Sequence, residues 1–84
     1  MSKPSRSRRG PNELSERLGE RVRALRKRKE WSLEALAERA GMHVTYLSSV
    51  ERGHRNPTLN VLAALASALD VTLSSLLDGM EEGK

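Results

Sequence analysis

Hydrophobic residues recur every three or four positions along most of the chain, and the pattern is clearest over residues 32–53. Two apolar stripes occur there, the first at Leu33, Leu36, Ala37 and Ala40, the second at Val44, Leu47 and Val50. This spacing is typical of amphipathic α-helices. Gly41 separates the stripes and Gly53 follows the second, at positions where a left-handed residue commonly ends a helix. The pattern therefore predicts two short helices joined by a tight turn, a helix-turn-helix.

The same periodicity predicts three further helices. The first runs from about residue 12 to residue 29 or 30, with a buried stripe at Leu14, Leu18, Val22 and Leu25. The other two follow the helix-turn-helix, over residues 58–69 and 72–79. Three of the predicted starts have a hydroxyl residue suited to an N-cap, namely Ser32, Thr58 and Thr72. We expect an all-α domain of five helices over residues 13–79, followed by a frayed tail over residues 80–84.

Three sequence runs resemble the Xre family, the Cro/repressor type of helix-turn-helix domain: SLEALAERAG, TYLSSVERG and RNPTL. The longer run HVTYLSSVERGHRNP is similar to controller proteins of restriction–modification systems, which often carry a Thr-Tyr-Ile/Leu-Ser and a Glu-Arg-Gly-x-Arg-Asn run. One position departs from the controllers, which often have a basic residue where this chain has Val44. The resemblance covers residues 14–78 and implies a five-helix Cro/repressor-type domain that binds DNA and regulates transcription.

Positive charge is concentrated before the first helix. The chain has 15 Lys and Arg against 11 Asp and Glu, a net charge of +4. Residues 1–12 have no acid and contribute this excess through Lys3, Arg6, Arg8 and Arg9. Because these residues also lack an aliphatic side chain after Met1, they predict a flexible basic arm. Such an arm can follow nucleic-acid phosphates or be a solvated tail, and the sequence leaves both open.

Composition argues against several other classes of protein. The chain has no cysteine and no metal-ligand spacing, so we expect no disulfide, metal or cofactor. No apolar run approaches the about 20 residues of a membrane span, and no signal peptide is visible, which predicts a cytoplasmic protein. The two histidines, His43 and His54, have no acid placed to orient them as a base. We therefore expect neither an enzyme nor a small-molecule ligand.

The polar face of the second helix of the helix-turn-helix supplies the candidate residues for reading DNA. In this docking mode the N-terminal part of that helix enters the major groove. The candidates for base contact are Val44, Thr45, Ser48 and Ser49. Their hydroxyls can donate to or accept from base edges, and the methyl groups of Val44 and Thr45 can contact a thymine methyl.

Contacts to the DNA backbone are expected on both sides of that helix. The resemblance implies sugar-phosphate contacts at Arg52, His54, Arg55 and Asn56, although Arg55 can reach a base instead. Backbone amides at the helix start capped by Ser32 form a further phosphate site. Tyr46 lies between the core and groove faces. Its hydroxyl is a candidate phosphate contact, and half-burial or a role in a dimer stays open.

The resemblance also implies a structural ion pair. The Xre family pairs a glutamate at the position of Glu51 with an arginine of the first helix, and Arg26 matches that arginine. We expect this pair to orient the second helix of the helix-turn-helix. The alternative is a solvated Glu51 in a charged last turn. Trp31 is expected to pack at the corner after the first helix, with base stacking as the alternative.

A leucine surplus in the last two helices predicts a second contact surface. The candidate residues for an isologous homodimer are Leu65, Leu73, Leu76 and Leu77. Leu73 and Leu77 can instead cover the core of the monomer. The leading hypothesis is a regulator that binds palindromic double-stranded DNA as a homodimer, with a restriction–modification controller as one candidate. The alternative is an antitoxin or adaptor whose main role is to bind a protein partner.

Overall fold

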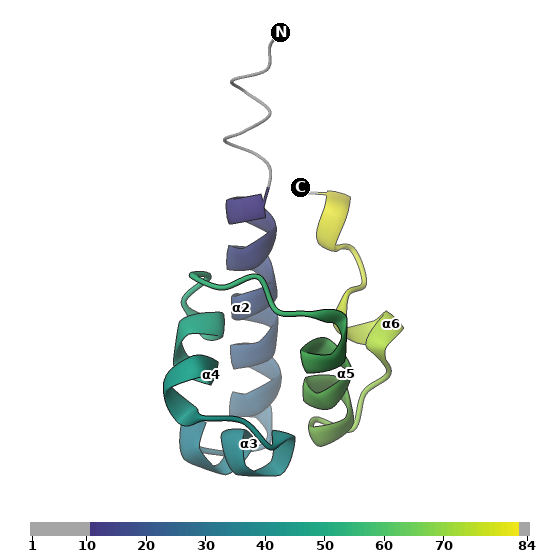
Figure 1. The fold of residues 1–84 in the computed structure, drawn as a ribbon. Helices are drawn as coiled ribbons and strands as arrows, with labels where there is room; N and C mark the ends of the chain where they lie inside the picture. The colour runs from purple at the N-terminus through teal and green to yellow at the C-terminus, as the bar shows by residue number, and fades with distance from the viewer. Residues whose placement is uncertain (1–10, 83–84) are drawn as a thin grey trace, which may run out of the picture.

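The computed structural model describes residues 11–82, and every regular element in that part of the chain is helical (Figure 1). The elements are α2 (Pro11–Arg28), α3 (Leu33–Ala40), α4 (Val44–Glu51), α5 (Leu59–Ala68), α6 (Leu73–Leu76) and a short 3₁₀ helix, η1 (Met80–Glu82). The predicted all-α architecture with five helices is confirmed. Within the described residues, no helix is long and apolar enough to cross a membrane.

The hydrophobic core lies where α2, α3, α4 and α5 meet. Helix α2 packs against α4, and α3 packs against both α4 and α5. The largest side chains with almost no exposed surface are Val22, Leu36, Leu47, Val50, Leu65, Leu69 and Leu76. Helices α2 and α4 approach closely at Gly19, where a Cβ atom would collide with the carbonyl oxygens of Val50 and Glu51. Backbone contact as well as side-chain packing therefore fixes α4 against α2.

Local capping explains where several helices begin and end. The hydroxyls of Ser32, Thr58 and Thr72 each accept a hydrogen bond from the backbone N–H three residues later, over 2.9–3.2 Å. This confirms the three predicted N-caps. Gly41 and Gly53 have φ angles of 72° and 79°, a left-handed conformation that glycine adopts without steric cost. Both glycines occur where the sequence pattern predicted helix ends.

The two ends of the domain differ from the prediction. Helix α2 begins at Pro11, so the last two residues of the expected arm belong to the helix, and residues 1–10 lie outside the described residues. The predicted frayed tail over residues 80–84 is wrong for residues 80–82, which form the 3₁₀ helix η1. The side chain of Met80 is only 8% exposed, and its carbonyl accepts a hydrogen bond from Arg17 Nη1 at 3.1 Å. Residues 83–84 of the expected tail are not among the described residues.

A second arginine of α2 holds the segment before η1. The guanidinium of Arg21 donates to the carbonyl oxygens of Ser75, Leu76 and Asp78 over 2.8–3.1 Å. These carbonyls lie in the last turn of α6 and just after it, where backbone acceptors lack the regular i→i+4 partners of a longer helix. Contacts between segments more than 50 residues apart in sequence thus order the C-terminal end of the domain.

The burial of individual leucines corrects two predictions. Leu65 and Leu76, proposed for a dimer contact, are 0% exposed and belong to the core of the chain. Each lies on the inner side of its helix, so neither can meet a second copy without unfolding. Leu73 and Leu77 are half-buried and pack against the same core. Conversely, Leu14 was expected to be buried and is 43% exposed, because it lies near the N-terminal end of α2, beyond the core.

Candidate nucleic-acid interface

Helices α3 and α4 form the helix-turn-helix, and α4 lies on the outside of the molecule beside α2 (Figure 1). The inner side of α4 buries Leu47 and Val50 completely. Its opposite side carries four of the predicted site residues: Thr45 and Arg52 are exposed, and Ser48 and Ser49 are half-buried at the edges of the stripe. The structure therefore brings the three predicted hydroxyls and one arginine together on one solvent-facing surface, called here the α4 face.

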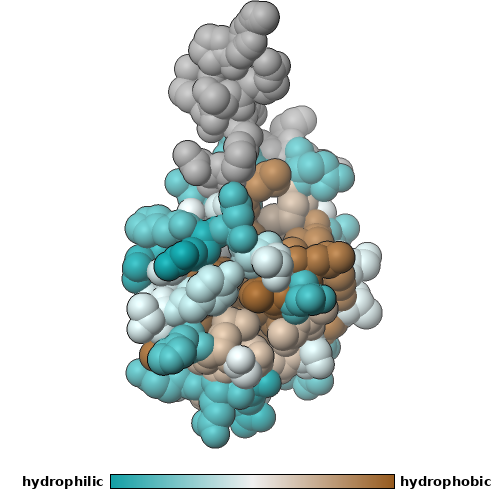
Figure 2. All heavy atoms as spheres, viewed as in Figure 1, coloured by the Kyte–Doolittle hydropathy of each residue, from teal (hydrophilic) through white to brown (hydrophobic). Residues whose placement is uncertain are grey.

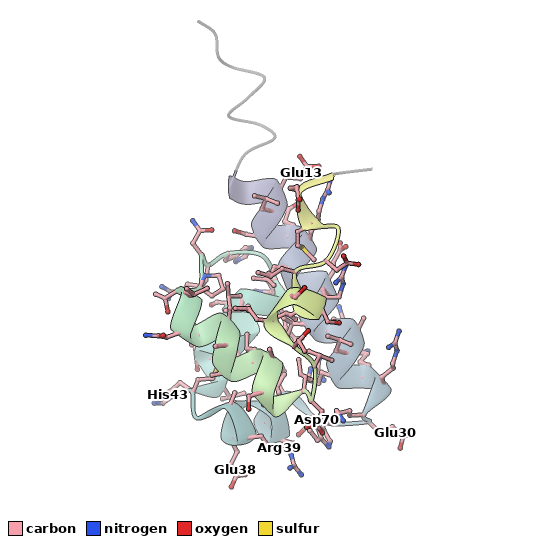
Figure 3. All side chains as sticks on the ribbon, turned by 90° about the vertical axis from the view of Figure 1, so that its right-hand side faces the viewer. Glu13, Glu30, Glu38, Arg39, His43 and Asp70 are labelled. Carbon is pink, nitrogen blue, oxygen red and sulfur yellow. The ribbon has the colours of Figure 1, made fainter. Side chains whose placement is uncertain are left out.

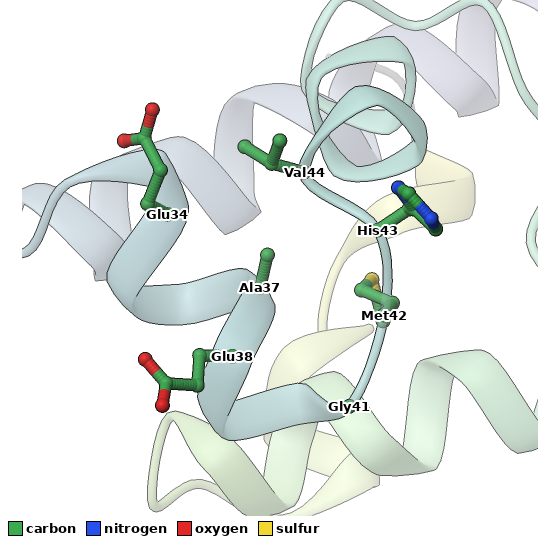
Figure 4. A pocket seen from close by; sticks show the side chains of 7 residues that line it. All are labelled: Glu34, Ala37, Glu38, Gly41, Met42, His43 and Val44. Atoms are coloured by element: carbon green, nitrogen blue, oxygen red, sulfur yellow. The ribbon is translucent and has the colours of Figure 1, made fainter.

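Val44, at the start of α4, differs from these residues because it is half-buried and packs against the core. It lines a hollow of about 490 Å³ between α3 and the start of α4, together with Glu34, Ala37, Glu38, Gly41, Met42 and His43. Figure 4 shows the side chain of Val44 pointing toward α3, where Glu34 and Glu38 project. The entry to α4 is thus apolar at its base and acidic at one rim, a feature that the sequence pattern did not indicate.

The predicted ion pair between Arg26 and Glu51 is present. Arg26 Nε donates to Glu51 Oε2 at 2.7 Å and Arg26 Nη2 to Glu51 Oε1 at 2.9 Å, so the pair is bidentate. The two side chains are only 10% and 6% exposed. The hydrogen bond to Glu51 is the main cause that raises the pKa of Arg26 above its ordinary value. Arg26 Nη1 also donates to the carbonyl of Trp31 at 2.8 Å, so one guanidinium connects α2, α4 and the turn before α3.

Two arginines at and beyond the end of α4 turn back onto that helix. Arg52 Nη1 donates to Ser48 Oγ at 2.6 Å. The guanidinium of Arg55 lies 5.6 Å from the centre of the Tyr46 ring, within the range of a cation–π contact. The ring of Tyr46 is half-buried against the core. Both cations are therefore partly positioned before any ligand binds.

Asn56, a predicted DNA-backbone contact, has a structural partner that sequence reasoning missed. Its Oδ1 accepts a hydrogen bond from Ser15 Oγ at 2.7 Å, and Ser15 is only 7% exposed. The hydrogen bond ties the loop after α4 to the first half of α2. The sequence signal that could have indicated it is a serine three residues before Leu18, on the side of α2 predicted to be buried. His54 and Arg55, in the same loop, are exposed.

The corner between α2 and α3 holds the aromatic ring of Trp31 among cations. Lys29 Nζ lies 5.2 Å and the Arg39 guanidinium carbon 4.3 Å from the ring centre. Lys29 also lies 3.6 Å from a carboxylate oxygen of Asp70, which Figure 3 shows at the same end of the molecule as Arg39. Trp31 is half-buried against the core, as expected for corner packing.

On another side of the molecule, apolar side chains remain accessible. Figure 2 shows them gathered on the right-hand side, over α5 and α6. A groove of about 580 Å³ is lined by Leu14, Ser15, Leu18, Asn56, Pro57, Leu62, Leu77, Met80 and Glu81. Leu59, one turn before Leu62, is 66% exposed. We call the surface formed by Leu14, Leu59, Leu62, Leu77 and Met80 the apolar surface.

Comparison with known proteins gives the class to which this fold and face belong. The family model described as Helix-turn-helix matches residues 22–76, from the middle of α2 to the end of α6. The chain belongs to this helix-turn-helix family, of the Xre type.

Curated relatives include both general regulators and controller proteins. The transcriptional regulator SinR of Bacillus subtilis is 42% identical over 66 residues, covering 77% of this chain and 60% of SinR. The chain thus spans less than two thirds of the length of that relative. The control protein C.SmaI of Serratia marcescens is 46% identical over 65 residues, covering 77% of each chain. The resemblance to the Xre family, with controllers among its relatives, is confirmed.

Solved structures agree with this assignment. The restriction–modification controller C.AhdI of Aeromonas hydrophila matches with a TM-score of 0.72 and 40% identity, over 74% of this chain and 94% of that one. SinR in complex with DNA matches with a TM-score of 0.69 and 44% identity, over 73% and 98%. A complex of SinR with the SinI protein matches with a TM-score of 0.71 and 41% identity, over 80% and 66%.

Proposed function

We propose that the chain is a sequence-specific DNA-binding regulator of transcription. The observation that carries this proposal is the α4 face, which presents hydroxyls and an arginine to solvent. The buried ion pair and the close approach at Gly19 hold α4 in a fixed orientation. A rigid helix of this kind, the second of a helix-turn-helix, suits the major groove of DNA. The relative SinR, whose structure was solved with DNA, supports the proposal. Such a regulator works in the cytoplasm, where bacterial DNA lies.

The contacts follow from the positions of the side chains. Thr45, Ser48 and Ser49 meet base edges, and Val44 offers an apolar contact at the entry of the helix. A second group of residues meets the sugar-phosphate backbone: Ser32, Tyr46, Arg52, His54, Arg55 and Asn56. Since Ser15 occupies the Oδ1 atom of Asn56, the NH₂ group of Asn56 stays available as a donor to a phosphate oxygen. Phosphate contacts fix the register of the protein, and base contacts read the sequence.

The proposed regulator is a homodimer, and the second copy covers the apolar surface. An open groove lined by Leu14, Leu62 and Leu77, together with the 66% exposed Leu59, leaves apolar surface in water, which is unfavourable. Self-complementary use of one such surface gives a dimer with a two-fold axis. The two α4 helices then enter successive major grooves about 34 Å apart, which requires a palindromic operator. Leu77 belongs to this surface and Leu73 contributes at its border, and both are half-buried.

The second candidate function is that of an adaptor or antitoxin that binds a different protein. The complex of the relative SinR with SinI is the observation that favours it. The apolar surface would serve such a partner as well as a second copy. Sedimentation velocity of the purified chain separates the two candidates. A dimer at micromolar concentration supports the homodimeric regulator, whereas a persistent monomer favours the adaptor.

Selection of bound sequences from a random DNA pool tests the main proposal. A homodimeric regulator should enrich one motif with two-fold symmetry and half-sites about one helical turn apart. Glu51→Gln tests the role of the ion pair in orienting α4, and should weaken enrichment if the protein stays folded. Recovery of unrelated sequences at physiological salt would show that the chain does not read DNA.

The basic arm adds a separate prediction, because its four cations lie before α2. Each cation that neutralises a phosphate steepens the log–log salt dependence of binding by about 0.9. Deleting residues 2–10 should therefore flatten the slope by about 2–4 per protomer if most of the charges engage. The ranking of operators should not change, because α4 is untouched. An unchanged slope would identify the arm as a solvated tail.

A further inference from the structure

Arg52 and Ser48 are linked twice on the α4 face. The backbone N–H of Arg52 donates to the carbonyl of Ser48 at 3.1 Å, as the last hydrogen bond of the helix. The side chain then returns along the helix, and its Nη1 donates to the Ser48 hydroxyl oxygen at 2.6 Å. Arg52 is exposed and Ser48 is half-buried beside it, so the hydrogen bond lies on the surface that would meet DNA.

The chemistry of this hydrogen bond is one-directional. A guanidinium has five N–H donors and no acceptor, whereas a serine hydroxyl has one donor and two acceptor lone pairs. Ser48 Oγ therefore accepts from Arg52, and one of its lone pairs is used. A charged donor on the oxygen also polarises the O–H bond, which makes the remaining hydrogen a better donor and the remaining lone pair a poorer acceptor.

The other two hydroxyls of the α4 face differ from Ser48. Within residues 11–82, the side chains of Thr45 and Ser49 make no hydrogen bond to the protein. Each can rotate its hydroxyl to donate or to accept, so each tolerates either kind of base edge. Thr45, Ser48 and Ser49 have similar side chains, but the hydrogen bond from Arg52 makes the hydroxyl of Ser48 differ from the other two.

We propose that Arg52 sets the hydrogen-bond polarity of Ser48, so that Ser48 selects for an acceptor on a base edge in the major groove. This inference rests on the proposed function and specifies how one residue of the α4 face discriminates. The acceptors available there are N7 and O6 of guanine, N7 of adenine and O4 of thymine, whereas cytosine presents its N4 amino donor. Ser48 should accordingly disfavour cytosine at the position that it contacts. Arg52 is a positioning residue in this scheme, in addition to any contact with phosphate.

The test is selection from a random DNA pool with four proteins: the unchanged chain, Ser48→Ala, Arg52→Met and the double variant. Methionine keeps much of the length of arginine and removes the donors and the charge. We expect one position per half-site where cytosine is depleted by about 3- to 10-fold, the worth of one net hydrogen bond. Ser48→Ala and Arg52→Met should each abolish that depletion. The double variant should resemble the single variants there, because both changes remove the same effect.

A matched control is Ser49→Ala, which removes a hydroxyl that Arg52 does not hold. Its effect should fall on a different base pair and should persist unchanged in the Arg52→Met background. A second probe is an operator with 7-deazaguanine or 7-deazaadenine, which lacks the N7 acceptor, at a purine that Ser48 contacts. If N7 is the acceptor, the substitution should weaken binding of the unchanged chain and leave the Ser48→Ala variant unaffected.

The outcomes separate the inference from the function on which it rests. If Arg52→Met lowers affinity equally on all sequences and reduces the salt slope by about 1, with the base profile unchanged, Arg52 contacts phosphate only and the inference is wrong. The proposed function as a DNA-binding regulator would not be affected by that result. If the unchanged chain enriches no motif, the proposed function itself is overturned and the inference falls with it. Thermal melting of each variant identifies any loss that is due to unfolding.

Discussion

The α4 face and the apolar surface lie on one small domain and differ in how their side chains are held. On the α4 face, Ser48 is bonded to Arg52, and nearby Tyr46 lies under Arg55. The helix itself is anchored by the buried ion pair of Glu51 with Arg26. The apolar surface, in contrast, surrounds an open groove of about 580 Å³, and its Leu14 and Leu59 side chains are 43% and 66% exposed. Ser48 and Arg52 on the α4 face are thus already held in place in the single chain, whereas the apolar surface still has apolar area to bury.

The difference indicates two kinds of partner. Polar recognition requires donors and acceptors in fixed places, because a misaligned hydrogen bond loses most of its value. Apolar association depends mainly on the area removed from water and tolerates adjustment of side chains. The α4 face therefore suits a ligand with a pattern, such as the edges of base pairs. The apolar surface suits another protein surface, for which we propose a second copy of the chain.

The largest expected effect comes from breaking the anchor of the α4 face. Glu51→Ala leaves the guanidinium of Arg26 buried without its carboxylate, which costs about 3–5 kcal/mol in the free energy of unfolding. Urea or thermal denaturation measures this loss. The control is Glu38→Ala, a change at an exposed carboxylate of α3, which should stay within about 0.5 kcal/mol of the unchanged chain. Equal melting temperatures for the Glu51→Ala variant and the unchanged chain would contradict the structural role of the pair.

The next effect concerns the apolar surface. Leu59→Glu should leave the fold intact, because Leu59 is 66% exposed, but should weaken the proposed dimer. Loss of one buried leucine is worth about 1.5–3 kcal/mol, or roughly ten- to a hundred-fold in the dissociation constant, and a two-fold dimer loses two. Sedimentation equilibrium provides the measurement. The neighbouring Asn60→Glu adds the same charge at an exposed polar residue and should have a much smaller effect.

The same leucine-to-glutamate change at Leu76 should have a different result. Because it is 0% exposed, Leu76→Glu should unfold the chain rather than produce a folded monomer. Circular dichroism distinguishes the two results. A folded, monomeric Leu76→Glu protein would show that the last helices can leave the core.

A smaller effect should come from the hydroxyls on the α4 face. Combined replacement of Thr45 and Ser49 by alanine should reduce discrimination by about 1–3 kcal/mol at one or two base pairs per half-site. The free energy of unfolding should change little, since neither side chain makes a hydrogen bond to another residue within residues 11–82. The measurement is the binding profile across single-base variants of the operator. A profile identical to that of the unchanged chain would indicate that the protein recognises DNA shape rather than these base edges.

The smallest effect is expected where the loop after α4 meets α2. Ser15→Ala removes the hydrogen bond to Asn56 and should cost about 0.5–1.5 kcal/mol of stability. DNA affinity should change less than stability, because the backbone N–H of His54 still donates to the Ser49 carbonyl and Arg55 still lies over Tyr46. The control is Ser67→Ala, a replacement of an exposed serine within α5. A double-mutant cycle of Ser15→Ala with Asn56→Ala that shows no coupling would contradict the contact.

Local signals in the sequence determined the helices and most of their ends. A hydroxyl at an N-cap and a glycine at a C-terminus act through neighbouring backbone groups, so Ser32, Thr58, Thr72 and Gly41 could be assigned from sequence alone. Periodicity likewise located the residues on the outer side of α4, because the inner stripe of Leu47 and Val50 leaves only one side for solvent. The ion pair of Arg26 with Glu51 was predictable only through the resemblance to the Xre family.

Only the tertiary structure decided which apolar residues are covered and which polar residues are paired. Leu65 and Leu76 are in the core, while Leu14 and Leu59 are exposed, although all four have the same side chain. Periodicity gives the side of a helix but not how far along the helix the neighbouring elements extend. The hydrogen bonds of Ser15 to Asn56 and of Arg17 to the Met80 carbonyl join residues 41 and 63 positions apart, which no local rule can connect. Burial and pairing depend on what lies across the fold, so they follow from the packing of helices rather than from any one stretch of sequence.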